Sequence, residues 1–380
     1  MDIIKVVQGY VHRMTGEGSK KVSEMNVLLL DADTTSIISM ATTQSSLLAN
    51  QIYLIDRLDN HRREKLRHLK CICFIRPTSE SIQNLIEEFR DPKYGDYSIY
   101  LSNVIRKSSL ERLAEADDHE VVQSIMEFYA DYLVINQDLF SFHFTSRRNR
   151  LYGDAPDTWD PDSLSSCTEG IIALLLSLKK KPLIRYEKNS PMAKKLSSEI
   201  SFQVTQEGQL FDFRRTDTAP ILLILDRKND PITPLLSQWT YQAMVHELLG
   251  IENGRVDLSS VPDIRQDLKE VVLSTEQDTF YKTNIYMNFG DLGANIKNYV
   301  NQYQSKTKSN MDIESIADMK RFVEEYPEFR KLSGNVSKHV TLLGELSRIV
   351  DAQSLLEVSE LEQSLACNDS HASDLKVGFL

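Results

Sequence analysis

Residues 71–89 read CICFIRPTSESIQNLIEEF, and the two halves of this stretch differ in periodicity. Cys71 to Arg76 is a short apolar run, which predicts a strand. From Ser79 onward, apolar side chains recur at helical spacing behind a Pro-Thr-Ser start signal, at Ile82, Leu85, Ile86 and Phe89. A strand followed at once by an amphipathic helix is typical of an α/β unit with a parallel sheet.

The same alternation extends over residues 26–135. Further strands are expected at Asn26–Asp31, Ile52–Leu58, Tyr97–Ser102 and Tyr132–Asn136. Before the last of them, Ser108 with Glu111 and Asp117 with Glu120 have the spacing of capping boxes, which predicts two consecutive helices.

A second α/β unit is expected after residues 145–163, which lack periodicity and predict an exposed connection. It holds a helix around Gly170–Lys179, a strand at Leu183–Tyr186, a helix from about Pro191 and a strand at Ile221–Leu225. The last strand is continuously apolar, which predicts burial on both faces.

After Pro234 the pattern becomes helical. Two long periodic segments within residues 289–326 are separated by the polar stretch 304–312, which predicts a helical hairpin. A third periodic run, Leu332–Val350, follows Pro327, which we expect to break or kink the helix. The expected fold is therefore α/β plus α, with two parallel-sheet, Rossmann-like units and a helical remainder.

Composition narrows the class of protein. The formal net charge of −11 over 380 residues argues against a nucleic-acid binder, because binding phosphates requires a basic face. Four scattered cysteines fit a reducing compartment. Met1–Arg13 lacks the apolar core of a signal peptide, and the longest apolar run, Ile171–Leu178, is too short to span a bilayer. We expect a cytoplasmic protein that reaches membranes through partners.

Sites for covalent chemistry are not evident. The turn after the first strand, Asp31–Thr35, has no glycine that would let a phosphate approach the backbone, and no metal motif occurs. We therefore expect no cofactor and no catalytic residues. Asp226, Arg227 and Asp230 follow a strand and are interpreted as a structural ion-pair cluster.

A basic island covers residues 61–70 and includes Arg62 and Arg63. It is either a solvated face or a site for an acidic helix or an anionic membrane surface.

Residues 222–250, LLILDRKNDPITPLLSQWTYQAMVHELLG, resemble a long and specific motif of the SM (Sec/Munc) family of vesicle-fusion regulators. Further matches are FIRPTSESI, GIIALLLSLKKKPLIRY, SIADMKRFVEEYPEF and SGNVSKHVTLLGELSR. The resemblance implies a non-enzymatic, three-domain arch with domains at 1–137, 138–236 and 237–380. Family members continue past residue 380, so the chain is expected to be a piece of a longer protein whose domain 2 sheet lacks partners.

The resemblance also implies partners. These are a syntaxin-type SNARE, bound through its N-terminal peptide and its SNARE and Habc helices, a vesicle SNARE, and the assembled SNARE complex. The implied protein is a monomer, peripheral on Golgi, endosomal or vacuolar membranes. Family members template SNARE assembly for vesicle fusion in this traffic.

Three sites follow from the resemblance. The N-peptide pocket maps to Leu110, Val122 and Ile125, with Leu113 and Phe128 as neighbours. The syntaxin cleft maps to Ser36, Thr43 and Asn50, where neuronal members carry charged contacts, together with Arg62 and Arg63. The SNARE-templating hairpin maps to Val300, Pro327 and Val340.

Two other functions stay open at this point. An α/β sheet can serve a nucleotide-dependent enzyme, which ligand-dependent stabilisation in a thermal melt would support. A structural tethering subunit that never contacts SNARE helices would be favoured if changes in the hairpin left SNARE binding intact.

Overall fold

The computed structural model of the chain describes residues 2–16, 25–142, 150–214, 217–311 and 316–367, and within 306–329 it describes the backbone only. The chain divides into two compact units, Met1–Arg227 (unit 1) and Lys228–Leu380 (unit 2). This division lies close to the boundary expected after residue 236. The domain expected at 1–137 and residues 138–227 of the next expected domain fall together in unit 1, and residues 228–236 fall in unit 2.

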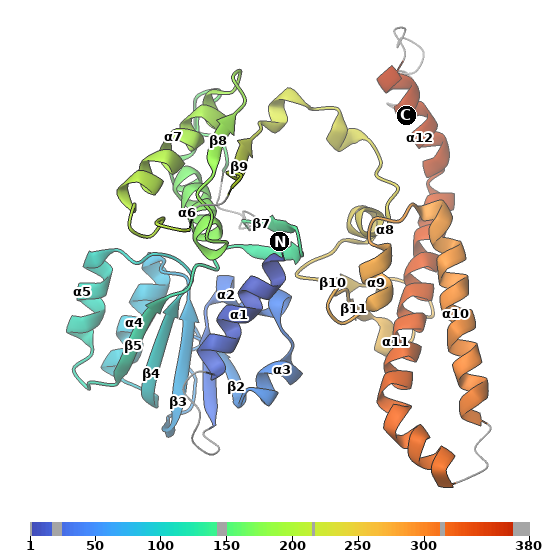
Figure 1. Cartoon of the computed structure of the whole chain (residues 1–380), viewed down its shortest axis with the longest axis horizontal. Coiled ribbons are helices and arrows are strands. Elements are labelled where there is room, and N and C mark those ends of the chain that lie inside the picture. Colours follow the sequence, from blue (N-terminus) through green and yellow to red (C-terminus); the bar gives the residue numbers. More distant parts are fainter. Residues whose placement is uncertain (1, 17–24, 143–149, 215–216, 312–315, 368–380) are drawn as a thin grey trace. The chain divides into compact units, whose positions relative to one another are not determined.

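Unit 1 is built on a five-stranded parallel sheet in the order β2-β1-β3-β4-β5 (Figure 1). The strands are β1 (Asn26–Leu30), β2 (Ile52–Arg57), β3 (Leu66–Ile75), β4 (Tyr94–Leu101) and β5 (Val122–Glu127). The predicted parallel-sheet α/β fold is thus confirmed. The strand order reverses between β1 and β3, so the carboxyl ends of these two strands form the topological switch point of the sheet.

Helices cover both faces of this sheet. They are α1 (Ile3–Gly16), α2 (Ala32–Ala41), α3 (Gln44–Ala49), α4 (Ser79–Arg90) and α5 (Lys107–Ala116). Leu28 and Leu30 of β1 pack in the cluster that holds α1, α2 and α3. Val27 and Leu29 pack in the cluster that holds α4 and α5. Successive strand residues therefore point into two different cores, as the pleat requires.

Helix α4 forms as predicted. Thr78 is its N-cap and accepts a hydrogen bond from the Ser81 backbone N–H at 3.1 Å. The four apolar positions of the predicted stripe, Ile82, Leu85, Ile86 and Phe89, are all buried. The helix thus covers the sheet with the face that periodicity assigns to it.

The prediction for residues 117–136 is wrong in two respects. The expected second helix is strand β5, because the Asp117 carboxylate accepts the Val121 and Val122 N–H groups, and Glu120 takes a positive φ of 52° that ends the helical turn. Tyr132–Asn136 does not join the sheet; it contributes β6 (Leu133–Asn136), which pairs antiparallel with β7 (Leu139–Ser141). The capping box at Ser108 is also wrong, since α5 begins at Lys107 and its N-cap is Arg106.

The rest of unit 1 contains α6 (Pro161–Ser177), α7 (Pro191–Gln206) and a parallel strand pair, β8 (Leu183–Tyr186) with β9 (Ile221–Ile224). Leu222 and Ile224 pack against the helices. Ile221 and Leu223, in contrast, are 67% and 58% exposed. The expected burial of this strand on both faces is wrong because only one face is covered by described residues.

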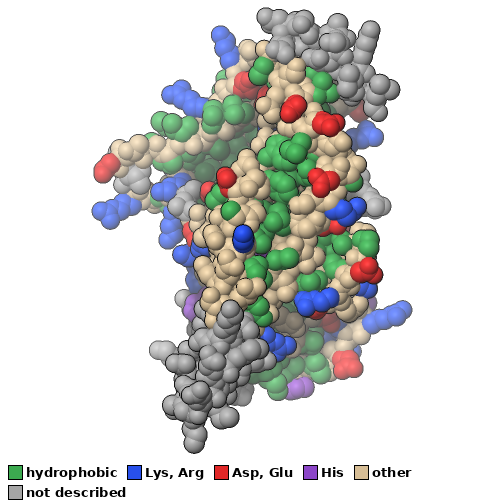
Figure 2. Space-filling model, turned by 90° about the vertical axis from the view of Figure 1, so that its right-hand side faces the viewer, with side chains coloured by type: hydrophobic (Ala, Val, Ile, Leu, Met, Phe, Trp, Pro, Cys, Tyr) green, Lys and Arg blue, Asp and Glu red, His purple; other side chains and the backbone are tan. Residues whose placement is uncertain are grey.

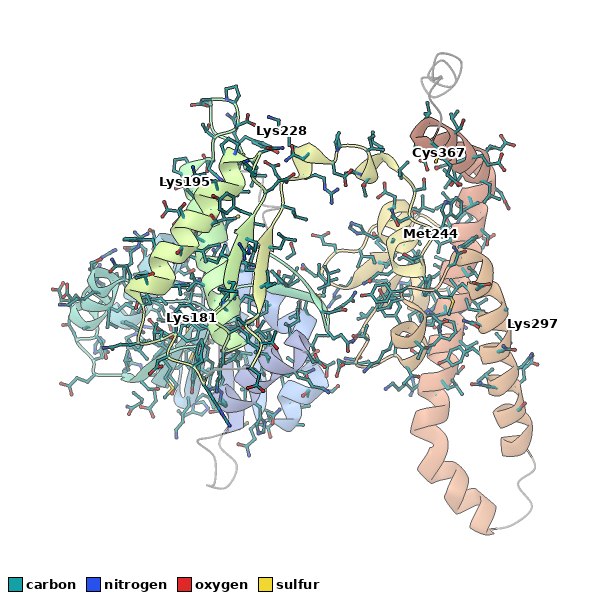
Figure 3. All side chains as sticks on the ribbon, turned by 45° about the horizontal axis from the view of Figure 1, so that its top comes forward. Lys181, Lys195, Lys228, Met244, Lys297 and Cys367 are labelled. Atoms are coloured by element: carbon teal, nitrogen blue, oxygen red, sulfur yellow. The ribbon has the colours of Figure 1, made fainter. Side chains whose placement is uncertain are left out.

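Unit 2 is mainly helical. Its elements are β10 (Arg255–Asp257), β11 (Glu270–Val272), α8 (Tyr241–Met244), α9 (Thr279–Asn284), α10 (Phe289–Met311), α11 (Ile316–Ala352) and α12 (Leu355–Cys367). One apolar cluster joins α8 through α11; Met244 lies within it, whereas Lys297 extends outward from α10 (Figure 3). None of the helices in the described ranges is long and apolar enough to cross a membrane.

The helical hairpin consists of α10 and α11, which lie side by side (Figure 1). The polar stretch after Gln304 continues α10 as far as Met311, and residues 312–315 lie outside the described residues. Of the two alternatives expected at Pro327, the break is wrong, since α11 runs through this residue and includes the third periodic run, and the kink stays a prediction. A proline costs a helix about 3 kcal/mol, and the buried stripe Val336, Leu342, Leu346 and Val350 offsets this cost by packing in unit 2.

Gly95 of β4 is expected to tolerate no side chain. A Cβ at this position would lie 2.5 Å from the Arg67 carbonyl oxygen of the neighbouring strand β3. Gly95→Ala should therefore lower the free energy of unfolding of unit 1 by about 1–3 kcal/mol in urea titrations. The matched change Gly9→Ala, on the exposed face of α1 with nothing within 4 Å, should raise it by up to about 1 kcal/mol. Equal effects of the two substitutions would contradict this account.

Candidate functional site

The switch point of the sheet is occupied by a polar network. Asp31, directly after β1, accepts hydrogen bonds from the Thr34 N–H at 2.8 Å, the Arg76 N–H at 2.7 Å and the Ser81 hydroxyl at 2.9 Å. It thereby caps α2 and anchors the turn that leads into α4. Burial raises the pKa of Asp31, and these hydrogen bonds partly offset that rise.

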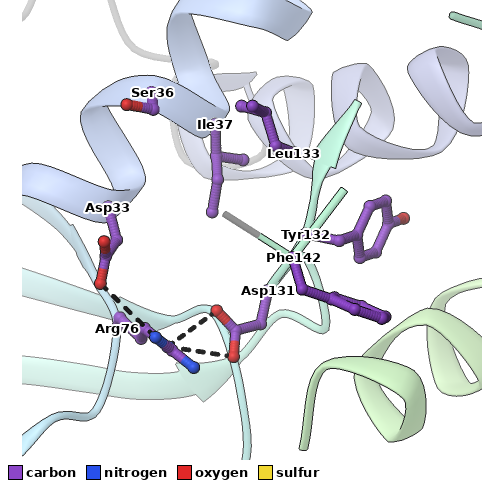
Figure 4. Close-up of a pocket in the computed structure, with 8 residues that line it drawn as sticks. All are labelled: Asp33, Ser36, Ile37, Arg76, Asp131, Tyr132, Leu133 and Phe142. Carbon is purple, nitrogen blue, oxygen red and sulfur yellow. Dashed lines mark hydrogen bonds and ion pairs between the residues drawn. The ribbon is translucent and has the colours of Figure 1, made fainter. Parts of the chain in front are cut away.

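A small pocket of about 30 Å³ lies beside this network (Figure 4). The Arg76 guanidinium forms ion pairs there with Asp131 at 3.0 Å and Asp33 at 3.7 Å. Burial raises the pKa of Asp131, and Arg76 opposes this rise. The pocket has room for about one water molecule. Asp33 and Asp131 thus hold the Arg76 guanidinium at the edge of the sheet where nucleotide-binding α/β proteins hold a phosphate.

The cleft residues Ser36, Thr43 and Asn50 lie on α2 and at the two ends of α3. Ser36 lines the small pocket. Thr43 caps α3 by accepting the Ser46 N–H at 3.1 Å, and the Asn50 side chain donates to the Ser46 carbonyl at 2.9 Å. All three side chains are half-buried, so their local roles leave part of each one accessible.

An apolar patch that the sequence reasoning missed lies next to α3. Tyr53 and Ile55, which share one face of β2 because side chains alternate along a strand, are 58% and 40% exposed; we call them the β2 edge patch. β2 is an edge strand that pairs only with β1 in the described sheet. Exposed apolar residues on an unpaired edge are typical of a protein interaction surface. An apolar run in a strand also predicts burial, so only the strand order could have revealed this patch.

The two arginines assigned to the cleft differ in exposure. Arg62 is exposed. Arg63 is buried; its guanidinium pairs with Glu88 at 2.8 Å and donates to the Leu58 and Asn60 carbonyls. The assignment of Arg63 to a binding surface is therefore wrong, because its charge is used inside unit 1.

The residues assigned to the N-peptide pocket do not form one surface. Leu110 on α5 is 38% exposed, and Val122 and Ile125 on β5 are half-buried against the same core as Leu113. Leu113 itself is buried, and Phe128 lies in the other core, with its ring centroid 4.8 Å from that of Tyr100. Leu113 and Phe128 are thus core residues, which corrects their assignment as accessible neighbours.

The hairpin presents apolar side chains on one side of unit 2. Figure 2 shows hydrophobic side chains gathered over α10, α11 and α12. Val340 on α11 is 45% exposed, whereas Val300 on α10 is half-buried. The side chain of Pro327 lies outside the described residues.

The acidic residues after β9 make local contacts. Asp226 accepts a hydrogen bond from the hydroxyl of Ser190, the N-cap of α7, at 2.6 Å, and Asp230 accepts one from the Thr233 hydroxyl at 2.9 Å. Arg227 is exposed. The Asp226 contact ties the end of β9 to the start of α7, and a structural role stays the interpretation of this cluster.

Comparison with known proteins identifies the family. The Sec1 family profile matches residues 26–377. This chain belongs to the Sec1 family. The predicted resemblance is thus confirmed.

Relatives within the Sec1 family match almost the whole chain. Vacuolar protein sorting-associated protein 45 of Schizosaccharomyces pombe is 55% identical over 98% of the chain and 66% of its own length. The human protein of the same name is 53% identical over 99% of the chain and 65% of its own length. The chain therefore spans about two thirds of the length of these relatives.

A solved structure of a family member shows the same fold. The SM protein Vps45 in complex with the Qa SNARE Tlg2 (1–310) superposes with a TM-score of 0.94 and 65% sequence identity. The match covers 99% of this chain and 67% of that one.

Proposed function

We propose that the chain binds syntaxin-type SNAREs and assists SNARE complex assembly for vesicle fusion. The observation that carries this proposal is the match over 99% of the chain, at 65% identity, to an SM protein solved with a Qa SNARE. The relatives named for vacuolar protein sorting suggest traffic among trans-Golgi, endosomal and vacuolar membranes, where the protein would be held through its SNAREs.

The activity proposed is binding rather than covalent chemistry. A chaperone of this kind changes the populations of SNARE conformations by binding one of them more tightly than the others. The small pocket at the switch point supports this view. The Arg76 ion pairs line it, and the space that they leave holds about one water molecule.

The three-domain arch is part of the proposal. Domain 1 would hold the syntaxin-type SNARE through Ser36, Thr43, Asn50 and Arg62, and the β2 edge patch offers the apolar surface that these polar residues lack. The hairpin would align a vesicle SNARE helix along Val300 and Val340. An amphipathic SNARE helix could bury its apolar stripe against such a face.

The N-terminal peptide of the syntaxin would bind beside α5 and β5. Leu110 supplies an exposed apolar side chain on α5, and Val122 and Ile125 are half-buried on β5 against the core that also holds Leu113 of α5. A short peptide that places an aromatic or aliphatic side chain there gains about 1.5–3 kcal/mol for each side chain that it buries.

Leu110→Arg tests this site. The variant should weaken binding of the syntaxin N-terminal peptide by more than about tenfold in calorimetric titrations, because an arginine would place a charge where an apolar side chain must be buried. Leu139→Arg on β7 is the matched control, since Leu139 is 45% exposed, and it should bind as the parent chain does. Equal affinities of both variants would place the peptide elsewhere.

A further inference from the structure

A buried polar cluster connects α11 to the body of unit 2. The Asp278 carboxylate accepts from His339 Nε2 at 2.8 Å and forms an ion pair with Lys338 Nζ at 2.5 Å. His339 Nδ1 lies 2.7 Å from the Tyr241 hydroxyl. We call Asp278, Lys338, His339 and Tyr241 the Asp278 cluster. His339 is fully buried, and Asp278 is 2% exposed.

Asp278 has a second role at the start of α9. Its other oxygen accepts the Tyr281 backbone N–H at 3.0 Å, which makes it the N-cap of that helix. One carboxylate therefore fixes the beginning of α9 and two consecutive side chains of α11. Lys338 also donates to the Val272 carbonyl at 3.1 Å, which adds the end of β11 to the same cluster.

The hydrogen bonds of the Asp278 cluster fit one protonation state of His339, the neutral imidazole with its proton on Nε2. With Nε2 protonated and donating to Asp278, Nδ1 can accept from the Tyr241 hydroxyl, so each of these polar groups has a partner. Aromatic rings enclose the imidazole on several sides. The Phe280 ring centroid lies 4.7 Å from that of His339, and the Tyr281 ring is nearly parallel to it.

Directional contacts of this kind set the rotation of a helix about its axis. An apolar contact tolerates a small rotation, whereas buried hydrogen bonds lose their partners when a donor moves by about 1 Å. Lys338 and His339 both face Asp278, and Val340 follows about 100° further round the helix. Val340 is consequently held toward solvent and is 45% exposed.

We propose that the Asp278 cluster positions α11 so that Val340 faces a vesicle SNARE helix. This inference rests on the proposed function of the hairpin and assigns to Asp278, Lys338 and His339 the role of positioning residues. They do not contact the SNARE. Their effect on binding passes through the orientation of Val340.

A double-mutant cycle in the full chain tests the proposal. The cycle combines Asp278→Asn with Val340→Ala, and the probe is the soluble SNARE motif of a vesicle SNARE, titrated by fluorescence anisotropy. Asparagine can still cap α9 but removes the charge that holds Lys338 and the acceptor for His339. Val358→Ala on α12, a valine that is 39% exposed, is the matched control and should not change binding.

Val340→Ala alone should weaken binding about fivefold, as expected for losing two buried methyl groups. In the Asp278→Asn background the same change should weaken it less than about twofold, because Val340 no longer has a fixed orientation. Binding of the syntaxin N-terminal peptide to unit 1 should stay unchanged. Lys338→Gln, which removes the positive charge that pairs with Asp278, repeats the cycle if Asp278→Asn does not fold.

Two outcomes would overturn the inference in different ways. A full fivefold effect of Val340→Ala in folded Asp278→Asn protein would show that the cluster does not position Val340. No effect of Val340→Ala in the parent chain, with vesicle SNARE binding intact, would remove Val340 from the hairpin site and the inference with it. If the chain bound no vesicle SNARE at all, the proposed function of the hairpin would itself fail.

Discussion

Replacing Glu88 by glutamine is expected to lower the free energy of unfolding of unit 1 by about 3–5 kcal/mol. Glu88 lies on α4 with a side chain only 1% exposed, and it pairs with Arg63 at 2.8 Å and with Lys93 at 3.1 Å. Tyr97 donates its hydroxyl to the same carboxylate. Burial would raise the pKa of Glu88, but these three partners outweigh it and the pKa is lowered.

The loss of stability in Glu88→Gln comes from Arg63, the charged partner that remains buried. Glutamine keeps the shape and one acceptor, so little packing is lost. The Arg63 guanidinium, with a side chain 2% exposed, would then be buried without a counter-charge. Removing one partner of a buried ion pair destabilises far more than the pair itself stabilises.

Urea titration would measure this loss in unit 1. The chain has two tryptophans, so a Trp239→Phe background leaves Trp159 as the reporter for unit 1. Glu87→Gln, the neighbouring exposed carboxylate on α4, is the control and should change the stability by less than about 0.5 kcal/mol. A comparable small loss for Glu88→Gln would show that the buried pair is unimportant.

His339→Ala is expected to destabilise unit 2 by about 2–4 kcal/mol. The substitution removes a fully buried ring that packs against Phe280 and Tyr281, and it leaves the Tyr241 hydroxyl and Asp278 each without one partner. Thermal unfolding followed by Trp239 fluorescence, in a Trp159→Phe background, would report on unit 2. His246→Ala, at an exposed histidine of the same unit, is the control and should have little effect.

The stability of unit 2 should fall as the pH falls from 7.5 to 5.5. Burial lowers the pKa of His339 below its ordinary value of 6.5, although Asp278 opposes this shift. Lys338 acts on it from α11, and the Tyr241 and Tyr281 rings pack against it from α8 and α9. The unfolded chain therefore binds a proton at a pH where the folded chain does not, and stability is lost below about pH 6.5.

His339→Ala should flatten this part of the pH profile. Asp278 adds little to the slope in this range, because its pKa is lowered and its contribution is lost only below its ordinary value of 3.8. A slope between pH 7.5 and 5.5 that persists in the variant would assign the effect to another group.

Local patterns in the sequence predicted the elements whose own residues decide their structure. Helix α4 was predicted with its cap and all four buried positions. β5 was not, since Val122 and Ile125 fit an i, i+3 spacing as well as a strand, and the choice depends on Asp117 and on pairing with β4. Pro327 indicates a break or a kink because its cost is local, whereas the packing that carries α11 through it comes from distant residues of unit 2.

The site residues also divide into those that the sequence could identify and those that depend on the folded structure. The family resemblance identified Leu110, Ser36 and Val340 as site positions. It did not distinguish the exposed Leu110 from the buried Leu113, or the exposed Arg62 from the buried Arg63. The β2 edge patch requires the strand order of the sheet. The Asp278 cluster joins residues 61 positions apart, and no spacing rule connects Asp278 with His339.

Calorimetric titration of the chain with the complete cytosolic part of a syntaxin-type SNARE tests the central claim most directly. We expect one-to-one binding with a dissociation constant of about 1 μM or tighter, equivalent to about 8 kcal/mol. We also expect that Leu110→Arg weakens this binding, while Leu139→Arg does not. Absence of binding at about 100 μM by a chain whose two units unfold cooperatively would contradict the proposal that this chain is a SNARE-binding protein.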